Sequence, residues 1–214
     1  MAKTIGIIQV KGGAGRSTLA TNLAGELSKR GPTVLIDSDM PQGTSASWCS
    51  IRGTTDQAGD LTGDTARDHQ ELIIKTERHA KTADYLVLDG PPRIAEMTRA
   101  ILMLSDVCLL PVAASVAEIW ATSDVLTIIE QARKVRPVDV RLVWTRHRAY
   151  TTLARELSDQ VKAELPLPRL KTTLGLRVAY VEALGAGLTV AETGDPAARE
   201  ELAHLMAEVG KILR

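Results

Sequence analysis

The 214-residue sequence predicts an α/β protein with one mostly parallel central sheet and helices on both of its faces. Short apolar runs alternate with segments of helical period, several runs end at an aspartate, and a glycine-rich turn joins the first run to the first helical segment. Neither an internal repeat nor a linker rich in Pro, Gly or Ser divides the chain. We therefore expect a single domain over residues 1–214.

Each predicted strand is a short run rich in Ile, Val and Leu. Runs that are apolar on both faces are typical of strands in a parallel sheet that helices cover on either side. The expected strands are residues 4–10, 34–37, 85–89, 107–111 and 140–144, with a shorter one near 168–172.

The segments between these strands carry apolar residues at helical spacing. In the first, over residues 17–30, Leu19, Leu23 and Leu27 fall on one face, and the Gly31-Pro32 pair ends the helix. Further helices are expected at residues 66–81, 94–104, 116–135, 150–164, 175–186 and 196–213.

The composition is that of an ordinary folded protein, with 44% hydrophobic and 24% charged residues and no Phe, so the core must be aliphatic. The 26 basic residues balance the 26 acidic ones, which argues against a global attraction to nucleic acid or to anionic membranes. Any such binding must come from a local patch. The two cysteines, Cys49 and Cys108, are too few for a disulfide scaffold or a four-ligand metal site.

The sequence shows no signal peptide, and its apolar stretches fall short of the ~18 residues that span a bilayer. At the C-terminus only Lys211 and Arg214 are basic, so a basic amphipathic membrane anchor is not expected. We expect a cytoplasmic protein that does not bind membranes.

Residues 11–18, which read Lys-Gly-Gly-Ala-Gly-Arg-Ser-Thr, lie between a strand and a helix. Glycine allows the backbone amides to turn inward and bind an anion at the start of the helix, and the Ser17 hydroxyl stands where it can coordinate Mg²⁺. The strict phosphate-loop pattern has Gly at position 10 and Lys at position 16, where this chain has Val10 and Arg16. The alternative is an ordinary glycine turn before a helix.

Three carboxylates follow predicted strands: Asp37 and Asp39 after the second, and Asp89 at the end of the third. Because ligands of open parallel sheets bind at the carboxyl ends of the strands, we expect these side chains near the glycine loop. In an extended segment Asp37 and Asp39 share one face. Asp89 is placed to hold the Mg²⁺ shell. The alternative role is that of a cap or turn residue.

The glycine loop resembles the deviant Walker A motif of the ParA/MinD family of P-loop ATPases, Lys-Gly-Gly-x-Gly-Lys-Ser/Thr. The resemblance continues through the segment from Asp37 to Gly43, followed by Trp48, through Asp89-Gly-Pro-Pro, through residues 105–112 and 118–120, and through residues 173–190. It implies the family's P-loop NTPase fold (SIMIBI/ParA-like) and the ligands ATP and Mg²⁺. Because the loop starts at residue 11, the chain resembles the short members without an N-terminal helix-turn-helix domain.

The resemblance also implies a role for each site residue. Lys11 reaches the phosphates bound by the other subunit of an ATP-sandwich homodimer. Asp39 polarises the attacking water, and Thr18 lies near the α-phosphate. The nucleotide-binding residues are Gly12, Gly13, Ala14, Gly15, Arg16, Ser17 and Thr18, and the magnesium residues are Ser17, Asp37 and Asp89.

The function implied is that of a slow partition or positioning ATPase. ATP drives dimerisation and nonspecific binding to double-stranded DNA on the nucleoid, and a ParB-like or cargo-adaptor activator triggers hydrolysis and release. The cargo is a plasmid, a chromosome region or a protein assembly. Two alternatives stay open: a hydrolysis-deficient, nucleotide-locked scaffold, and a maturation or metabolic enzyme of the same superfamily.

This chain departs from the family pattern at two positions. Met40 looks like a one-residue insertion after Asp39, and Arg16 replaces the phosphate-loop lysine. Arginine is a longer, planar fork, whereas lysine is a compact point charge, and a shift of ~1 Å at a reacting centre can reduce a rate about 10²-fold. We therefore predict that Arg16 acts in catalysis with Lys11 and Asp39 but that ATP hydrolysis is slow.

Basic residues gather in two stretches of the C-terminal half, residues 133–148 and 162–177. Basic clusters attract phosphate backbones without reading sequence, so the candidate DNA-binding residues are Arg146, Arg148 and Arg177. The alternative is a solvated charged face.

Overall fold

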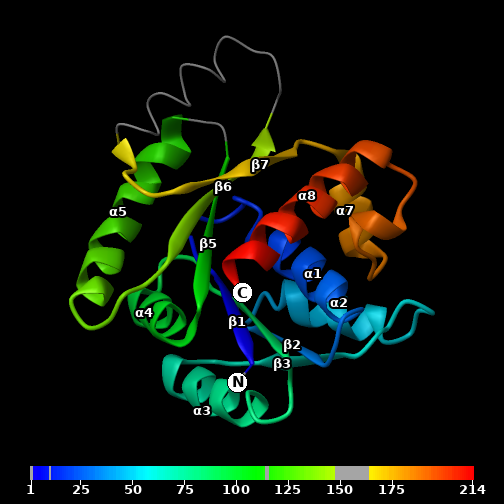
Figure 1. Cartoon of the computed structure of the whole chain (residues 1–214), viewed down its shortest axis with the longest axis horizontal. Helices are drawn as coiled ribbons and strands as arrows, with labels where there is room; N and C mark the ends of the chain where they lie inside the picture. The colour runs from blue at the N-terminus through cyan, green and yellow to red at the C-terminus, as the bar shows by residue number, and fades with distance from the viewer. Residues whose placement is uncertain (1, 10, 114–115, 148–163) are drawn as a thin grey trace.

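The computed structural model describes residues 2–9, 11–113, 116–147 and 164–214, and within residues 116–133 it describes side chains from Asp124 onward. Seven parallel strands in these residues form one sheet in the order β3-β2-β4-β1-β5-β6-β7 (Figure 1). Their bounds are β1 Lys3–Ile7, β2 Thr33–Asp37, β3 Leu61–Thr65, β4 Tyr85–Asp89, β5 Val107–Ala113, β6 Val140–His147 and β7 Arg169–Gly175.

Helices cover both faces of the sheet, which confirms the predicted α/β architecture (Figure 1). One face packs against α3 (His69–His79), α4 (Ala95–Leu104) and α5 (Val116–Arg133). The other packs against α1 (Arg16–Leu27), α2 (Thr44–Arg52), α7 (Val178–Gly185) and α8 (Pro196–Ile212), and a 3-10 turn, η1 (Val190–Glu192), precedes α8. The helix expected at residues 150–164 falls almost wholly outside the described residues.

The core is mainly aliphatic on both sides of the sheet, as the composition predicts, with Trp144 on one side and Trp48 and Tyr180 on the other. Strand residues such as Ile5, Ile36 and Leu88 are fully buried, and Cys108 is a small buried side chain in the same cluster as Ile36 and Leu88. Parallel strands buried on both faces need continuous apolar sequence, and this is why periodicity located β1, β2, β4, β5 and β6.

Two elements were not predicted, because little in their local sequence marks them. The edge strand β3 reads Leu-Thr-Gly-Asp-Thr, with one large apolar residue, and is held by its pairing with β2, in which Thr33 lies opposite Leu61. The helix α2 reads Thr-Ser-Ala-Ser-Trp-Cys-Ser-Ile-Arg, and Trp48 is its main core side chain. Tertiary contacts override weak local signals at both places.

The register of the parallel strands brings the loops after β1, β2 and β4 together. Asp89, the last residue of β4, lies opposite Ile7 of β1 on one side and opposite Asp37 of β2 on the other. The glycine loop that follows β1 therefore meets the predicted carboxylates at one edge of the sheet.

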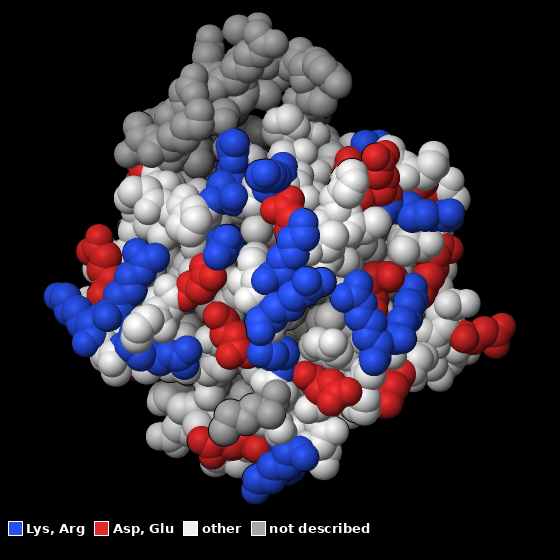
Figure 2. Space-filling model, in the orientation of Figure 1, with Lys and Arg blue, Asp and Glu red and all other residues white. Residues whose placement is uncertain are grey.

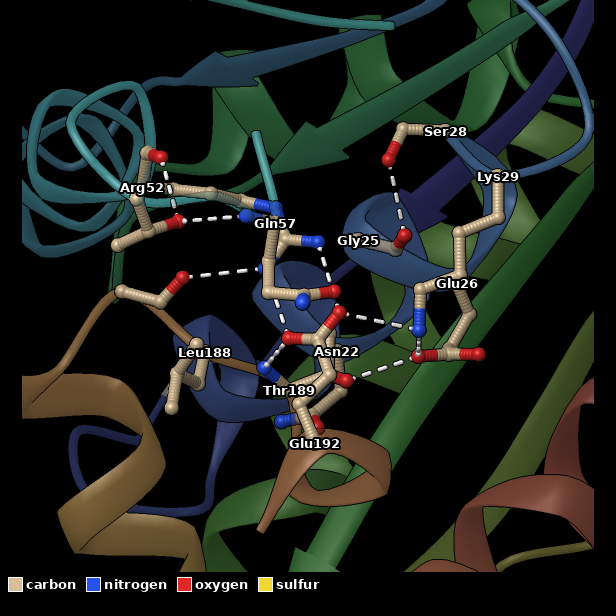
Figure 3. A network of polar contacts seen from close by, with 12 residues as sticks. Asn22, Gly25, Glu26, Ser28, Lys29, Arg52, Gln57, Leu188, Thr189 and Glu192 are labelled. Atoms are coloured by element: carbon tan, nitrogen blue, oxygen red, sulfur yellow. Dashed lines mark hydrogen bonds and ion pairs between the residues drawn. The ribbon is translucent and has the colours of Figure 1, made fainter. Parts of the chain in front are cut away.

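A buried ion pair fastens α2 to the segment before α8 (Figure 3). The Arg52 guanidinium, only 1% exposed, donates to both carboxylate oxygens of Glu192 at 2.9 and 3.0 Å and to the Gly187 carbonyl at 3.1 Å. It also lies over the ring of Trp48, 5.1 Å from the centroid. A two-bond, stacked arginine of this kind fixes orientation as well as distance.

The same segment is tied to α1. The Val190 amide donates to the side-chain oxygen of Asn22 at 2.8 Å, and the Thr189 hydroxyl donates to Glu26 at 2.8 Å (Figure 3). These bonds fix the position of α1, the helix that begins at the glycine loop.

Within the described residues, the helices lack the combination of length and apolar sequence that crossing a bilayer requires.

Candidate nucleotide-binding site

The glycine loop closes over an open cavity at the carboxyl edge of the sheet. Gly13 (φ +83°) and Gly15 (φ +91°) lie in the left-handed region, which other residues rarely adopt, and Gly15 caps the start of α1. From behind, the Thr145 hydroxyl of β6 donates to the Ala14 carbonyl at 2.7 Å. The cavity has a volume of about 450 Å³ and is lined by Gly12, Gly13, Gly15, Arg16, Ser17, Thr18, Asp39, Gln42, Thr44, Pro92 and Leu184.

Asp37 is fully buried beneath this cavity, and both of its carboxylate oxygens already accept backbone bonds. One accepts the Asp39 amide at 2.9 Å, and the other accepts the Ala46 amide in the first turn of α2 at 2.9 Å. Asp37 therefore holds Asp39 and α2 in place. Asp39 lies in the turn after β2 and lines the cavity, whereas Asp37 does not. The prediction that the two side chains share one face is therefore wrong, because the chain turns after β2 instead of staying extended.

Asp89 is the residue best prepared for a cation. It is fully buried, its Oδ2 accepts the Ser45 hydroxyl at 2.6 Å, and its Oδ1 has no hydrogen-bond partner in the described part of the chain. Burial and then the nearby Asp37 charge raise the pKa of Asp89 to about 7, although the hydroxyls of Ser45 and Ser17 and the Arg16 charge act in the opposite direction.

These groups fit a divalent cation. Mg²⁺ takes oxygen ligands, usually one or two carboxylates with hydroxyl or water oxygens and the phosphates of a nucleotide. A buried carboxylate oxygen without a partner, beside the Ser17 hydroxyl at the start of α1, supplies such donors. A bound cation would offset the unfavourable burial of the Asp89 charge.

Arg16, the first residue of α1, is folded against the backbone of the loop and is only 6% exposed. Its Nη1 donates to the carbonyls of Gln9 (3.1 Å) and Lys11 (2.7 Å), and its Nη2 lies 3.1 Å from Oδ2 of Asp39. The sequence pattern placed a cation here, but only the structure shows its ion pair with the candidate water-positioning carboxylate.

A second, mainly apolar cavity of about 310 Å³ adjoins the loop on the side of β6 and α7. Two candidate DNA-binding residues line it. Arg146, with φ +50°, donates to the Gly13 carbonyl at 3.1 Å. Arg177 donates to Glu201 at 2.9 and 2.8 Å, and the same carboxylate accepts the Tyr180 hydroxyl at 3.0 Å.

The structure therefore places Arg146 and Arg177 beside the glycine loop, where they are engaged in contacts within the chain, rather than on a separate basic surface. Arg148 lies outside the described residues. The sequence grouped these residues because they are close along the chain, whereas their surroundings depend on where β6 and α7 meet the loop.

A different set of basic residues lies around the start of β7 and the end of α8. The face in Figure 2 shows Lys and Arg side chains in a band across its middle, with acidic side chains among them. The start of β7 lies along the last turns of α8, because Glu208 of α8 accepts the Thr172 and Lys171 amides at 2.8 Å. Exposed basic residues around this contact are Arg30, Arg169, Lys171, Lys211 and Arg214. They are scattered along the sequence, so no local signal marks them.

Comparison with solved structures identifies the fold. The chain superimposes on a Cyanothece McdA variant in complex with ATP with a TM-score of 0.82 and 17% sequence identity, covering 98% of this chain and 96% of that one. It superimposes on the septum site-determining protein MinD with Mg-ADP from Pyrococcus horikoshii with a TM-score of 0.77 and 14% identity, covering 99% and 97% of the two chains.

Sequence comparison gives the relationship. The chain is 28% identical over 212 residues to maintenance of carboxysome distribution protein A of Halothiobacillus neapolitanus, covering 97% of this chain and 96% of that protein. It is 25% identical over 218 residues to the chromosome-partitioning ATPase Soj of Thermus thermophilus, covering 89% and 88%. Its homologues are ParA/MinD-family P-loop ATPases, and the solved structures that it matches have the same fold. No protein-family model matches it.

These relationships confirm the resemblance drawn from the motifs, and the nucleotide complexes among the matched structures support nucleotide and Mg²⁺ binding. The main difference between this chain and the ParA/MinD motif is at position 16, where an arginine paired with Asp39 replaces the lysine.

Proposed function

We propose that this protein is an ATP-switched positioning ATPase that binds Mg-ATP, forms a face-to-face homodimer, and then binds duplex DNA without reading its sequence. The observation that carries the proposal is the meeting of the glycine loop, Asp39 and the buried Asp89 at one edge of the sheet. That edge is where ligands of open parallel sheets bind.

The chemistry follows from the groups around the cavity. Backbone amides of residues 12–18, at the positive end of the α1 dipole, hold the ATP phosphates. Ser17 and Asp89 hold Mg²⁺, which neutralises phosphate charge when bound. Asp39 orients the attacking water, and Asp37 fixes the Asp39 backbone through the 2.9 Å bond from its amide. The apolar cavity beside Tyr180 accepts the base.

Exposed apolar side chains around the same edge support the homodimer. Met40 and Ile94 follow the carboxyl ends of β2 and β4, and Leu176, Val178 and Val181 follow the end of β7. Apolar groups gathered next to a site are typical of protein interfaces. In the dimer, Lys11 reaches the phosphates bound by the second copy.

DNA binding uses the exposed basic residues around the C-terminal end of α8, and Arg146 and Arg177 contribute through the nucleotide site. A neutral protein with a local basic band binds DNA through phosphate contacts that weaken as salt rises. The dimer is thereby associated with the nucleoid.

We infer a protein assembly as the cargo, with an adaptor protein that stimulates ATP hydrolysis. The support is the similarity to carboxysome distribution proteins, which extends over nearly the whole chain. A chromosome region is the cargo favoured by the similarity to the chromosome-partitioning ATPase Soj.

The test is oligomeric state and duplex-DNA binding with ATP, with ADP and without nucleotide, for the natural protein and for Arg16→Lys. We expect dimers and DNA binding with ATP alone, and faster turnover in the lysine variant. DNA binding that ignores the nucleotide, or ATP-independent dimers, would contradict the switch.

The Arg16–Asp39 ion pair favours a second candidate, a nucleotide-locked scaffold that does not hydrolyse ATP. Phosphate release measured with DNA and adaptor present separates the two, because a scaffold releases none.

A further inference from the structure

Arg16 contacts both the glycine loop and the residue that we place next to the attacking water. We propose that, without nucleotide, Arg16 is a latch that holds Asp39 and that ATP must open. Arg16 is then a positioning residue that acts through Asp39. The inference rests on the proposed function, because it assumes that ATP enters this cavity.

The latch consists of three contacts made by one guanidinium. Nη1 donates to the carbonyls of Gln9 and Lys11 near the start of the glycine loop, and Nη2 pairs with Asp39 at 3.1 Å. Arg16 is 6% exposed and Asp39 is 18% exposed, so solvent screens the pair only weakly. The planar fork makes these contacts from two separate nitrogens, whereas the three donors of a lysine ammonium all lie on one nitrogen.

The position of Arg16 explains why it takes a carboxylate partner. It is the first residue of α1, where the helix dipole is positive, and the first turn of α1 contains no acidic residue. A guanidinium remains charged at any physiological pH, so burial here requires an acceptor from elsewhere. Asp39 supplies that negative charge.

ATP competes for the same guanidinium. Arg16 and Asp39 line one cavity, and Nε of Arg16 is buried without a partner in the described residues, so it is a donor available to an entering phosphate. A triphosphate carries more negative charge than one carboxylate and accepts an arginine fork well. When the guanidinium turns to the phosphates, Asp39 is released to orient water, which orders hydrolysis after ATP binding.

The first test is equilibrium binding of Mg-ATPγS to the natural protein, Asp39→Asn, Arg16→Lys and the double variant. If the latch is closed nine-tenths of the time, Asp39→Asn tightens binding about tenfold. Loss of Asp39 repulsion alone also tightens binding, so the comparison is with the Arg16→Lys background, where we expect about threefold or less. An equal or larger gain in the lysine background would overturn the latch.

The second test needs no nucleotide. Urea unfolding of the natural protein, Arg16→Gln, Asp39→Asn and the double variant should be non-additive, with the second substitution less destabilising once the first is made. Additive effects would overturn the ion pair. Glu77→Gln, an exposed acid on α3, controls for net charge. If the natural protein binds no ATPγS, the proposed function fails, and this cycle still decides whether the pair exists.

Discussion

At the scale of single residues, the site contains two buried carboxylates whose surroundings depend on distant parts of the chain. Asp37 and Asp89 lie opposite each other on adjacent strands, both fully buried. Asp37 is satisfied by two backbone amides, whereas Asp89 keeps an oxygen without a partner among the described residues. Two strand-end aspartates that look equivalent in the sequence therefore have different surroundings: Asp37 holds the loops, and we propose that Asp89 binds a cation.

We expect Asp89→Asn to weaken ATPγS binding in the presence of Mg²⁺ by roughly 10- to 100-fold, the range seen when groups that support a metal are removed. Binding measured in excess EDTA should change little, because Asp89 acts through the cation. Calorimetry with and without Mg²⁺ measures both. An equal loss in EDTA would show that Asp89 supports the loop rather than the metal.

At the scale of elements, α2 depends on a long-range network. Arg52 ends α2, and its carboxylate partner, Glu192, lies 140 positions away along the chain (Figure 3). Burial on its own would raise the pKa of Glu192, but hydrogen bonds from Arg52, the Thr189 amide and Lys29 outweigh it and hold the pKa at about 2. The network holds α2, the helix whose Ala46 amide donates to Asp37.

The pH dependence of unfolding tests this network. A carboxyl whose folded pKa lies below its unfolded value of 4.5 stabilises the fold above pH 4.5, and this stability is lost as the pH falls toward 2. Glu192→Gln should therefore lower the free energy of unfolding by about 3 kcal/mol at pH 7, and the difference should shrink below pH 4.5.

Urea titrations at pH 7 and at pH 3 measure the change. Glu200→Gln, an exposed change on α8, serves as the matched control and should shift the unfolding free energy little at either pH. A Glu192→Gln difference that stays constant with pH would show that the Glu192 charge contributes no stability.

At the scale of the whole molecule, two regions differ in character. The carboxyl edge carries the glycine loop, the aspartates and exposed apolar side chains, which suits a nucleotide and a second copy. The region around the start of β7 and the end of α8 carries exposed basic residues. We propose that this protein of zero net charge binds DNA through the basic region and responds to ATP at the other.

Charge reversals separate the two regions. We expect Lys211→Glu with Arg214→Glu to weaken ATP-dependent DNA binding at least ~10-fold and to leave ATPγS affinity unchanged, because these residues lie away from the cavities. Arg177→Glu should instead destabilise the protein and weaken ATPγS binding, because it sets a carboxylate against Glu201. Fluorescence anisotropy with labelled DNA and with labelled nucleotide reads both. Unchanged DNA binding in the double variant would show that these basic residues are not part of the DNA-binding surface.

The sequence by itself determined the α/β class, the order of most strands and helices, the glycine loop, and the convergence of Asp37, Asp39 and Asp89 on that loop. These features follow from local chemistry: apolar periodicity, glycine between a strand and a helix, and the rule that parallel strands end at one edge. The resemblance to the ParA/MinD family was also accessible, because the motifs lie in short contiguous segments.

Only the tertiary structure decided which partner each charged group has. It paired Arg16 with Asp39, Arg177 with Glu201 and Arg52 with Glu192, and it built β3 and α2 from segments of weak local preference. The physical reason is that buried charges need acceptors, and those acceptors come from wherever the chain packs, which is 23, 24 and 140 positions away in these three pairs. Composition and spacing contain the charges, but the packing of distant elements chooses their contacts.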